Sequence, residues 1–75
     1  MIEKEYIIKI GDLYLSYFIV SMYEVKTEFI KQIRFSLKDE ALFFSDKEDA
    51  ELISKKIFLL LGIQCEVVET NETED

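Results

Sequence analysis

The sequence contains no histidine, no proline and no tryptophan, with one cysteine and two glycines among 75 residues. Without histidine, the chain cannot form a Ser-His or Cys-His nucleophile or a His-ligated metal site. A single cysteine excludes disulfide scaffolds and zinc sites built on several cysteines. The scarcity of glycine and proline excludes collagen-like and linker-like chains. We therefore expect no enzyme activity, no cofactor and no metal ion.

Positive charge is also scarce. Nine lysine and arginine residues stand against 16 aspartates and glutamates, for a net charge of -7, and Arg34 is the only arginine. A protein that binds nucleic acid directly needs a positive surface that displaces counterions from phosphate. We therefore expect no direct contact with nucleic acid.

Long apolar runs are missing as well. The longest are residues 17–20 and 57–61, which are far shorter than the ~20 residues that cross a bilayer. Residues 1–5 lack the basic region and apolar core of a signal peptide. We expect a cytoplasmic protein that makes no contact with a membrane.

Hydrophobic residues make up 49% of the chain, which is enough for one small folded domain. We expect this domain over residues 1–69, followed by a frayed acidic tail over residues 70–75. β-Branched and aromatic residues predict strands over residues 5–10, 13–23, 27–37 and 64–69, with a short strand over 42–44. Gly11 and Asp12 mark the first turn, and residues 38–41 predict a polar or helical turn.

Two of these strands have irregular alternation. Residues 13–23 carry apolar side chains on both faces, with Tyr14, Phe18 and Val20 on the second face. This pattern is typical of a central strand, of a bulge, or of a second face covered by another element. In residues 27–37, Lys31 interrupts the apolar face and Ile30 the polar one, which predicts a bulge or an edge position.

The strongest local signal is a capping box over residues 45–48. In this motif Ser45 accepts a hydrogen bond from the backbone N–H of Glu48, and the Glu48 side chain accepts one from the N–H of Ser45. Gly62 supplies the residue that ends a helix in the left-handed conformation. We expect a helix over residues 46–61.

Helical spacing divides this segment into two faces. The predicted core face spans roughly 100° and holds Ala50, Ile53, Ile57, Leu60 and Leu61. Leu52 and Leu59 lie on the opposite side, where we expect them to be exposed. The resulting fold class is α+β, with a small antiparallel β-meander, one helix packed on one face and a C-terminal strand, in the order β-β-β-(β)-α-β.

Three groups of residues with chemical potential have structural explanations. Cys65 has no cationic neighbour in the sequence to lower its pKa, so we interpret it as a small buried residue, with a reactive thiol as the alternative. The carboxylates within residues 46–51 suit a helix start better than a metal site. The four tyrosines suit packing. A nucleic-acid stacking surface would require, beside them, one exposed strip formed by Lys26, Lys31, Arg34 and Lys38.

Two stretches of the chain carry a resemblance. Residues 6–14 resemble the opening of small uncharacterised proteins from phages and prophages of Gram-positive bacteria. Residues 39–51, in which an Ala-x-x-Phe segment leads into a capped helix, and the terminal strand at 65–69 are similar to the later part of the same proteins. The resemblance implies a compact accessory protein built from a sheet and a helix, and it transfers no catalytic residue.

The surplus of apolar residues indicates a function. One helix face and one sheet face need fewer apolar side chains than the chain carries, and such a surplus is typical of an interaction surface. We expect a small phage-type accessory protein that binds another protein or forms a homo-oligomer, with a homodimer as the favoured form. The alternative is an acidic inhibitor that mimics nucleic acid and occupies a host or phage DNA-binding protein. The candidate interface residues are Tyr14, Phe18, Val20, Leu52 and Leu59.

Overall fold

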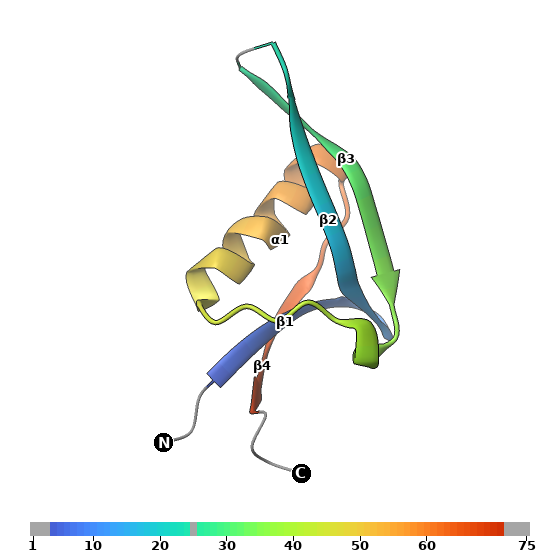
Figure 1. The fold of residues 1–75 in the computed structure, drawn as a ribbon, viewed down its shortest axis with the longest axis vertical. Coiled ribbons are helices and arrows are strands. Elements are labelled where there is room, and N and C mark those ends of the chain that lie inside the picture. The colour runs from blue at the N-terminus through green and yellow to red at the C-terminus, as the bar shows by residue number, and fades with distance from the viewer. Residues whose placement is uncertain (1–3, 25, 72–75) are drawn as a thin grey trace.

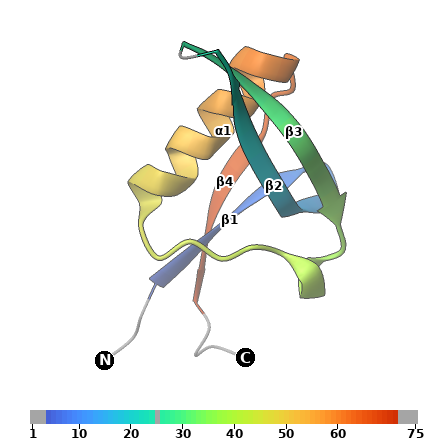
Figure 2. The same ribbon diagram turned by 45° about the horizontal axis from the view of Figure 1, so that its top comes forward.

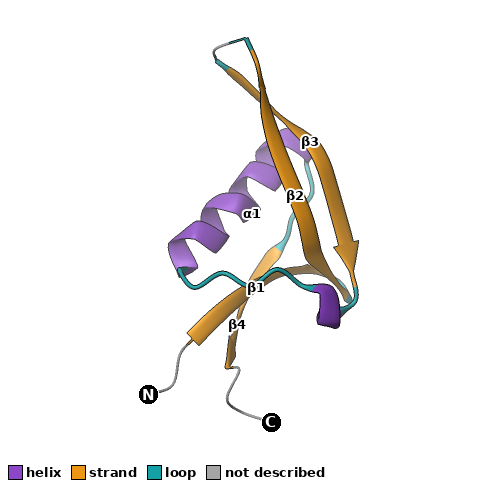
Figure 3. Ribbon diagram, in the orientation of Figure 1, coloured by secondary structure: helices purple, strands orange, loops and turns teal. Residues whose placement is uncertain are grey.

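The computed structural model describes residues 4–24 and 26–71. Within them lie the strands β1 (Lys4–Ile10), β2 (Leu13–Tyr23), β3 (Thr27–Ser36) and β4 (Glu66–Asn71), the 3-10 helix η1 (Lys38–Glu40) and the helix α1 (Lys47–Leu61). The strands form one antiparallel sheet in the order β3-β2-β1-β4, and α1 packs on one face of it (Figure 1, Figure 3). The predicted α+β class and element order are confirmed.

The ends of the strands differ from the predictions by a few residues at most. β2 coincides with the predicted strand, and the turn before it places Gly11 at φ 58°, a conformation that glycine adopts without strain. β4 runs to Asn71, so Thr70 and Asn71 belong to the sheet and not to the predicted tail. The rest of that tail, residues 72–75, and Val25 in the predicted hairpin turn lie outside the described residues.

A bulge in β2 explains why strict alternation assigned its apolar residues to both faces of the strand. The pairing with β3 passes over Ser16, between Leu15 and Tyr17. An extra residue of this kind reverses the alternation of the side chains beyond it. Leu15 is fully buried, and Phe18, three residues further along, packs against the same core cluster. Phe18 therefore lies with the core and not on a second face beside Tyr14.

A second bulge lies in β3, where Lys31 is the extra residue between Gln32 and Ile30. The irregularity predicted at this position is confirmed, and β3 is also an edge strand. The bulge brings Ile30 to the core side together with Ile33 and leaves Lys31 exposed. Charged residues and bulges on an edge strand discourage its pairing with other chains.

The segment between η1 and α1 crosses β1 and is held there by its backbone (Figure 1, Figure 2). Tyr6 and Phe44 exchange two backbone hydrogen bonds of 2.8 Å, and the N–H of Leu42 donates to the carbonyl of Leu15 at 2.9 Å. The strand expected over residues 42–44 is therefore an isolated bridge. The helical turn expected just before it is η1.

The helix α1 begins one residue later than predicted. Its N-cap is Asp46, whose carboxylate accepts a hydrogen bond from the backbone N–H of Glu48 at 3.0 Å. The predicted capping box with Ser45 as the cap is wrong, because the carboxylate satisfies this N–H and adds negative charge at the positive end of the helix dipole. The predicted end is confirmed: Gly62 has φ 73°, and its N–H donates to the carbonyl of Phe58 at 2.8 Å.

The core lies between α1 and the sheet. Its fully buried residues are Ile8 of β1, Leu15 of β2, and Ala50 and Ile57 of α1. Leu60 and Leu61 were also expected on the core face, but both are exposed. The last turn of α1 lies beside the hairpin β2–β3 (Figure 1). Because this hairpin twists away from β1 and β4 and extends past the helix, it does not cover these two leucines.

Candidate functional site

The five candidate interface residues do not share one surface. Leu52 and Leu59 are exposed on α1, as expected. Phe18 packs against the core, and Val20 is half-buried on the same side of the sheet, because it alternates with Phe18. Tyr14 lies on the opposite face, where the ammonium group of Lys9 is 5.7 Å from the centre of its ring. Only the helix residues form a coherent exposed surface.

An ion pair joins this surface of α1 to the far part of the hairpin. The Nζ atom of Lys56 lies 2.9 Å from Oε2 of Glu28, and Glu28 is the cross-strand partner of Met22. Three leucines lie one turn before or after Lys56 on the helix. Met22 flanks the other end of the ion pair as the partner of Glu28, and the exposed fractions of these four residues are 51%, 54%, 67% and 38% in chain order. We call this group the apolar shoulder, and its members are Met22, Leu52, Leu59 and Leu60.

Sequence reasoning found two members of the apolar shoulder and missed two. Leu60 was missed because helical spacing placed it on the predicted core face, and it is exposed instead. The sequence feature that could have indicated Met22 is the difference in length between its strand and the helix. An 11-residue strand spans about 37 Å, whereas a 15-residue helix spans about 22 Å. The end of a hairpin this long extends past the helix that packs on it.

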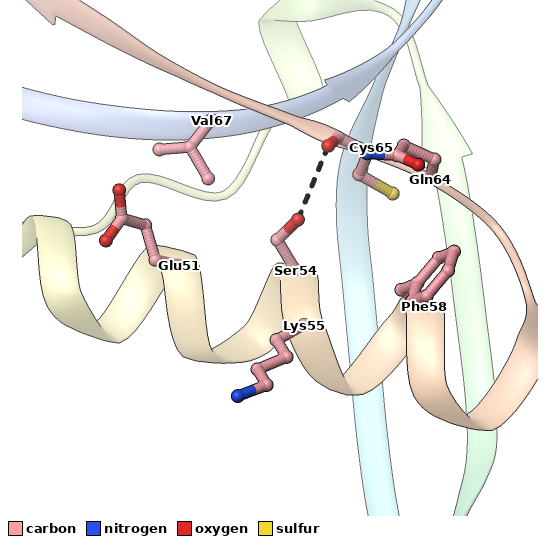
Figure 4. A pocket seen from close by; sticks show the side chains of 7 residues that line it. All are labelled: Glu51, Ser54, Lys55, Phe58, Gln64, Cys65 and Val67. Carbon is pink, nitrogen blue, oxygen red and sulfur yellow. Dashed lines mark hydrogen bonds between the residues drawn. The ribbon is translucent and has the colours of Figure 1, made fainter.

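A pocket of about 380 Å³ lies on another side of α1, next to β4 (Figure 4). Its helix wall is formed by residues at positions i, i+3, i+4 and i+7, which share one helix face: Glu51, Ser54, Lys55 and Phe58. Its other wall is formed by Gln64, Cys65 and Val67.

A single hydrogen bond crosses this pocket, from the Ser54 hydroxyl to the carbonyl of Cys65 at 3.5 Å. In Figure 4 the Glu51 carboxylate points toward Val67 on one side of that bond, and Phe58 lies on the other side. Lys55 points away from the strand. The pocket therefore has a carboxylate at one end and an aromatic ring at the other.

Cys65 is half-buried in the wall of the pocket, and burial raises the pKa of its thiol. A raised pKa lowers the thiolate fraction at any given pH, and the thiolate is the nucleophile. We therefore predict that iodoacetamide at pH 8 alkylates Cys65 more slowly in the folded protein than in urea. Mass spectrometry over time measures both rates. A folded-state rate above the unfolded one would identify a reactive thiol, and equal rates would contradict the protection expected from burial.

The described residues also bear on metal binding, on membrane crossing and on nucleic-acid stacking. Within residues 4–24 and 26–71, no three histidine, cysteine, aspartate or glutamate side chains come together as a metal site. No helix described there has the length and apolar character that a membrane crossing requires. Among the tyrosines, Tyr17 lies beside the basic residues of β3, with the Arg34 guanidinium 5.5 Å from its ring centre, whereas Tyr6 packs against the core.

Comparison of the chain with protein-family models, with curated proteins and with solved structures finds no match. The resemblance to phage and prophage proteins therefore stays a prediction. The observations that bear on function are the surfaces of the fold, above all the apolar shoulder and the pocket beside β4.

Proposed function

We propose that this protein is a non-enzymatic accessory protein that acts by binding proteins, and that it forms a homodimer through the apolar shoulder. The supporting observation is that exposed apolar side chains flank both residues of one ion pair: leucines beside Lys56 on α1, and Met22 opposite Glu28 on the hairpin. Apolar surface removed from water contributes about 25 cal/mol per Å². Exposed apolar side chains that gather in one place mark interaction sites in soluble proteins.

The charge of the apolar shoulder favours a second copy as the partner. In a dimer with two-fold symmetry, the same patch of each copy contacts itself. A patch with net charge would repel its counterpart, but Lys56 and Glu28 neutralise each other within the shoulder at 2.9 Å. The charges of this central pair therefore do not oppose the approach of a second copy.

Light scattering at low micromolar concentration tests this proposal. We expect the wild-type protein to have twice the 8.9 kDa mass of one chain. The double variant Leu52→Lys, Leu59→Lys should raise the dissociation constant of the dimer at least about thirtyfold, because residues at the centre of an interface carry most of its binding energy.

The matched control is Leu37→Lys, at a leucine that is 68% exposed beside η1. This variant makes the same chemical change outside the apolar shoulder, so its dissociation constant should equal that of the wild type. A monomeric wild type at low micromolar concentration would refute the homodimer, and an equal loss of dimer in the control would refute the apolar shoulder as its interface.

The acidic-mimic alternative also stays a prediction, as does a cytoplasmic location. Mimicry requires carboxylates arrayed along one face. Glu48 and Asp49 instead follow the Asp46 cap in the first turn of α1, where negative charge stabilises the helix. Because no described contact favours mimicry, protein binding through the apolar shoulder is the better-supported function.

A further inference from the structure

β4 is an edge strand whose outer backbone side is open. It pairs with β1 in an unbroken register from Lys4↔Asn71 to Lys9↔Glu66, and among the described residues it forms no backbone–backbone hydrogen bond with any other segment. Alternate N–H and C=O groups of an edge strand point away from its one neighbour, so they are available to another extended chain. The opposite edge, β3, is a poorer template because of its bulge at Lys31.

The pocket beside β4 lies at the start of this open edge, where Val67 is the residue of β4 that lines it. Ser54 and Phe58 contribute to it from one face of α1, and Cys65 and Val67 from the chain at the start of β4 (Figure 4). A groove between a helix and an edge strand suits strand addition. In that binding mode the backbone ladder of the bound peptide supplies affinity, and alternate side chains enter the pocket.

The charges nearest the edge favour one kind of peptide. Glu66 and Glu69 are exposed on opposite faces of β4. Glu66 lies opposite Lys9, and Glu69 forms an ion pair with Lys4 at 3.3 Å, but both lysines lie on β1, one strand further from the edge. A second copy would add its own glutamates and a net charge of -7 to this edge, whereas a basic segment brings charge of the opposite sign. A basic segment of another protein is therefore a better occupant than a second copy.

We propose that the groove between α1 and β4 binds an extended partner segment, rich in apolar and in lysine or arginine residues, as an added strand beside β4. Its apolar side chains enter the pocket next to Phe58, and its basic ones lie near Glu66 on the other face of β4. This site is separate from the apolar shoulder, because Leu52 and Leu59 lie on a different side of α1. Failure of the homodimer would therefore leave the groove proposal standing.

The first experiment adds a short capped peptide of alternating lysine and valine to the full chain and follows the backbone amide signals by NMR. We expect shifts at residues 65–70 and at the helix residues of the pocket, with slower hydrogen exchange at alternate β4 amides. A peptide with proline at alternate positions cannot donate to the ladder and should bind at least about tenfold more weakly. A peptide of alternating glutamate and valine should also bind more weakly.

The second experiment compares two charge reversals at exposed glutamates. Glu66→Lys should raise the dissociation constant of the lysine–valine peptide about fivefold, whereas Glu40→Lys in η1 should leave it unchanged. Bound peptide should also slow the alkylation of Cys65, because it covers the pocket.

Three results would overturn the proposal. The first is the absence of amide shifts at millimolar peptide. The second is a set of shifts confined to the acidic first turn of α1, which would indicate charge attraction without strand addition. The third is a shift of β4 amides with protein concentration when no peptide is present, which would identify a second copy as the occupant.

Discussion

Replacing Ile57 by alanine should lower the free energy of unfolding by about 3–4 kcal/mol, a typical cost of deleting a large, fully buried aliphatic side chain. Ile57 is 0% exposed and lies in the core cluster with Ile8 and Leu15, so nothing but a cavity replaces the lost atoms. Small domains have total stabilities of roughly 5–15 kcal/mol. The variant should therefore lose much of its stability, which urea titration followed by circular dichroism measures.

Leu59→Ala is the matched control, two residues away on the same helix. Because Leu59 is exposed, its truncation should change the free energy of unfolding by less than about 0.5 kcal/mol. Both titrations belong at a protein concentration where the chain is monomeric, since dimer dissociation adds to apparent stability. Equal losses for the two variants would mean that α1 presents a different face to the sheet.

The second large effect is expected at the bulge in β2. Phe18→Ala should cost about 2–3 kcal/mol, less than a fully buried phenylalanine because Phe18 is only half-buried against the core. Tyr17→Ala should cost less than about 1 kcal/mol, because Tyr17 lies on the outer face and mainly contacts Arg34. Urea denaturation of the two variants measures both losses.

These two neighbouring aromatic residues distinguish a bulged strand from a regular one. In a regular strand, Tyr17 would share the face of the buried Leu15, and Phe18 would lie on the other face. With Ser16 as the extra residue, this order is reversed. A larger loss for Tyr17→Ala than for Phe18→Ala would contradict the observed register.

The elements that the sequence predicts well are those with local signals. The turn at Gly11 and the uninterrupted run of strand-forming residues after it define β2, and Gly62 defines the end of α1. The start of α1 differs from the prediction because Asp46 is as good an N-cap as Ser45, and the path of the backbone decides between them. Local signals therefore predict which elements form but leave their ends uncertain by a residue or two.

The two bulges differ in how visible they are in the sequence. Lys31 is charged and interrupts an apolar face, so a bulge or an edge position near it could be predicted. Ser16 is a small residue that fits either face, so the pattern around it left three explanations open. Pairing with β3 decides among them, and this long-range contact leaves no local signal.

The functional surfaces depend still more on tertiary structure. Helical spacing alone found Leu52 and Leu59. Met22 joins the apolar shoulder because the hairpin extends past α1, and the pocket exists because Cys65 and Val67 return beside the helix. Such placements bring distant parts of the chain together, so no single segment predicts them.

In the proposed homodimer, two copies of the chain meet at the apolar shoulder. The most direct test mixes isotope-labelled with unlabelled protein and records NMR NOEs between methyl groups of different copies. We predict intermolecular NOEs for the methyl groups of Met22, Leu52 and Leu59 and none for those of Leu37. A sample without intermolecular NOEs at the shoulder, or with them at Leu37 instead, would contradict the homodimer.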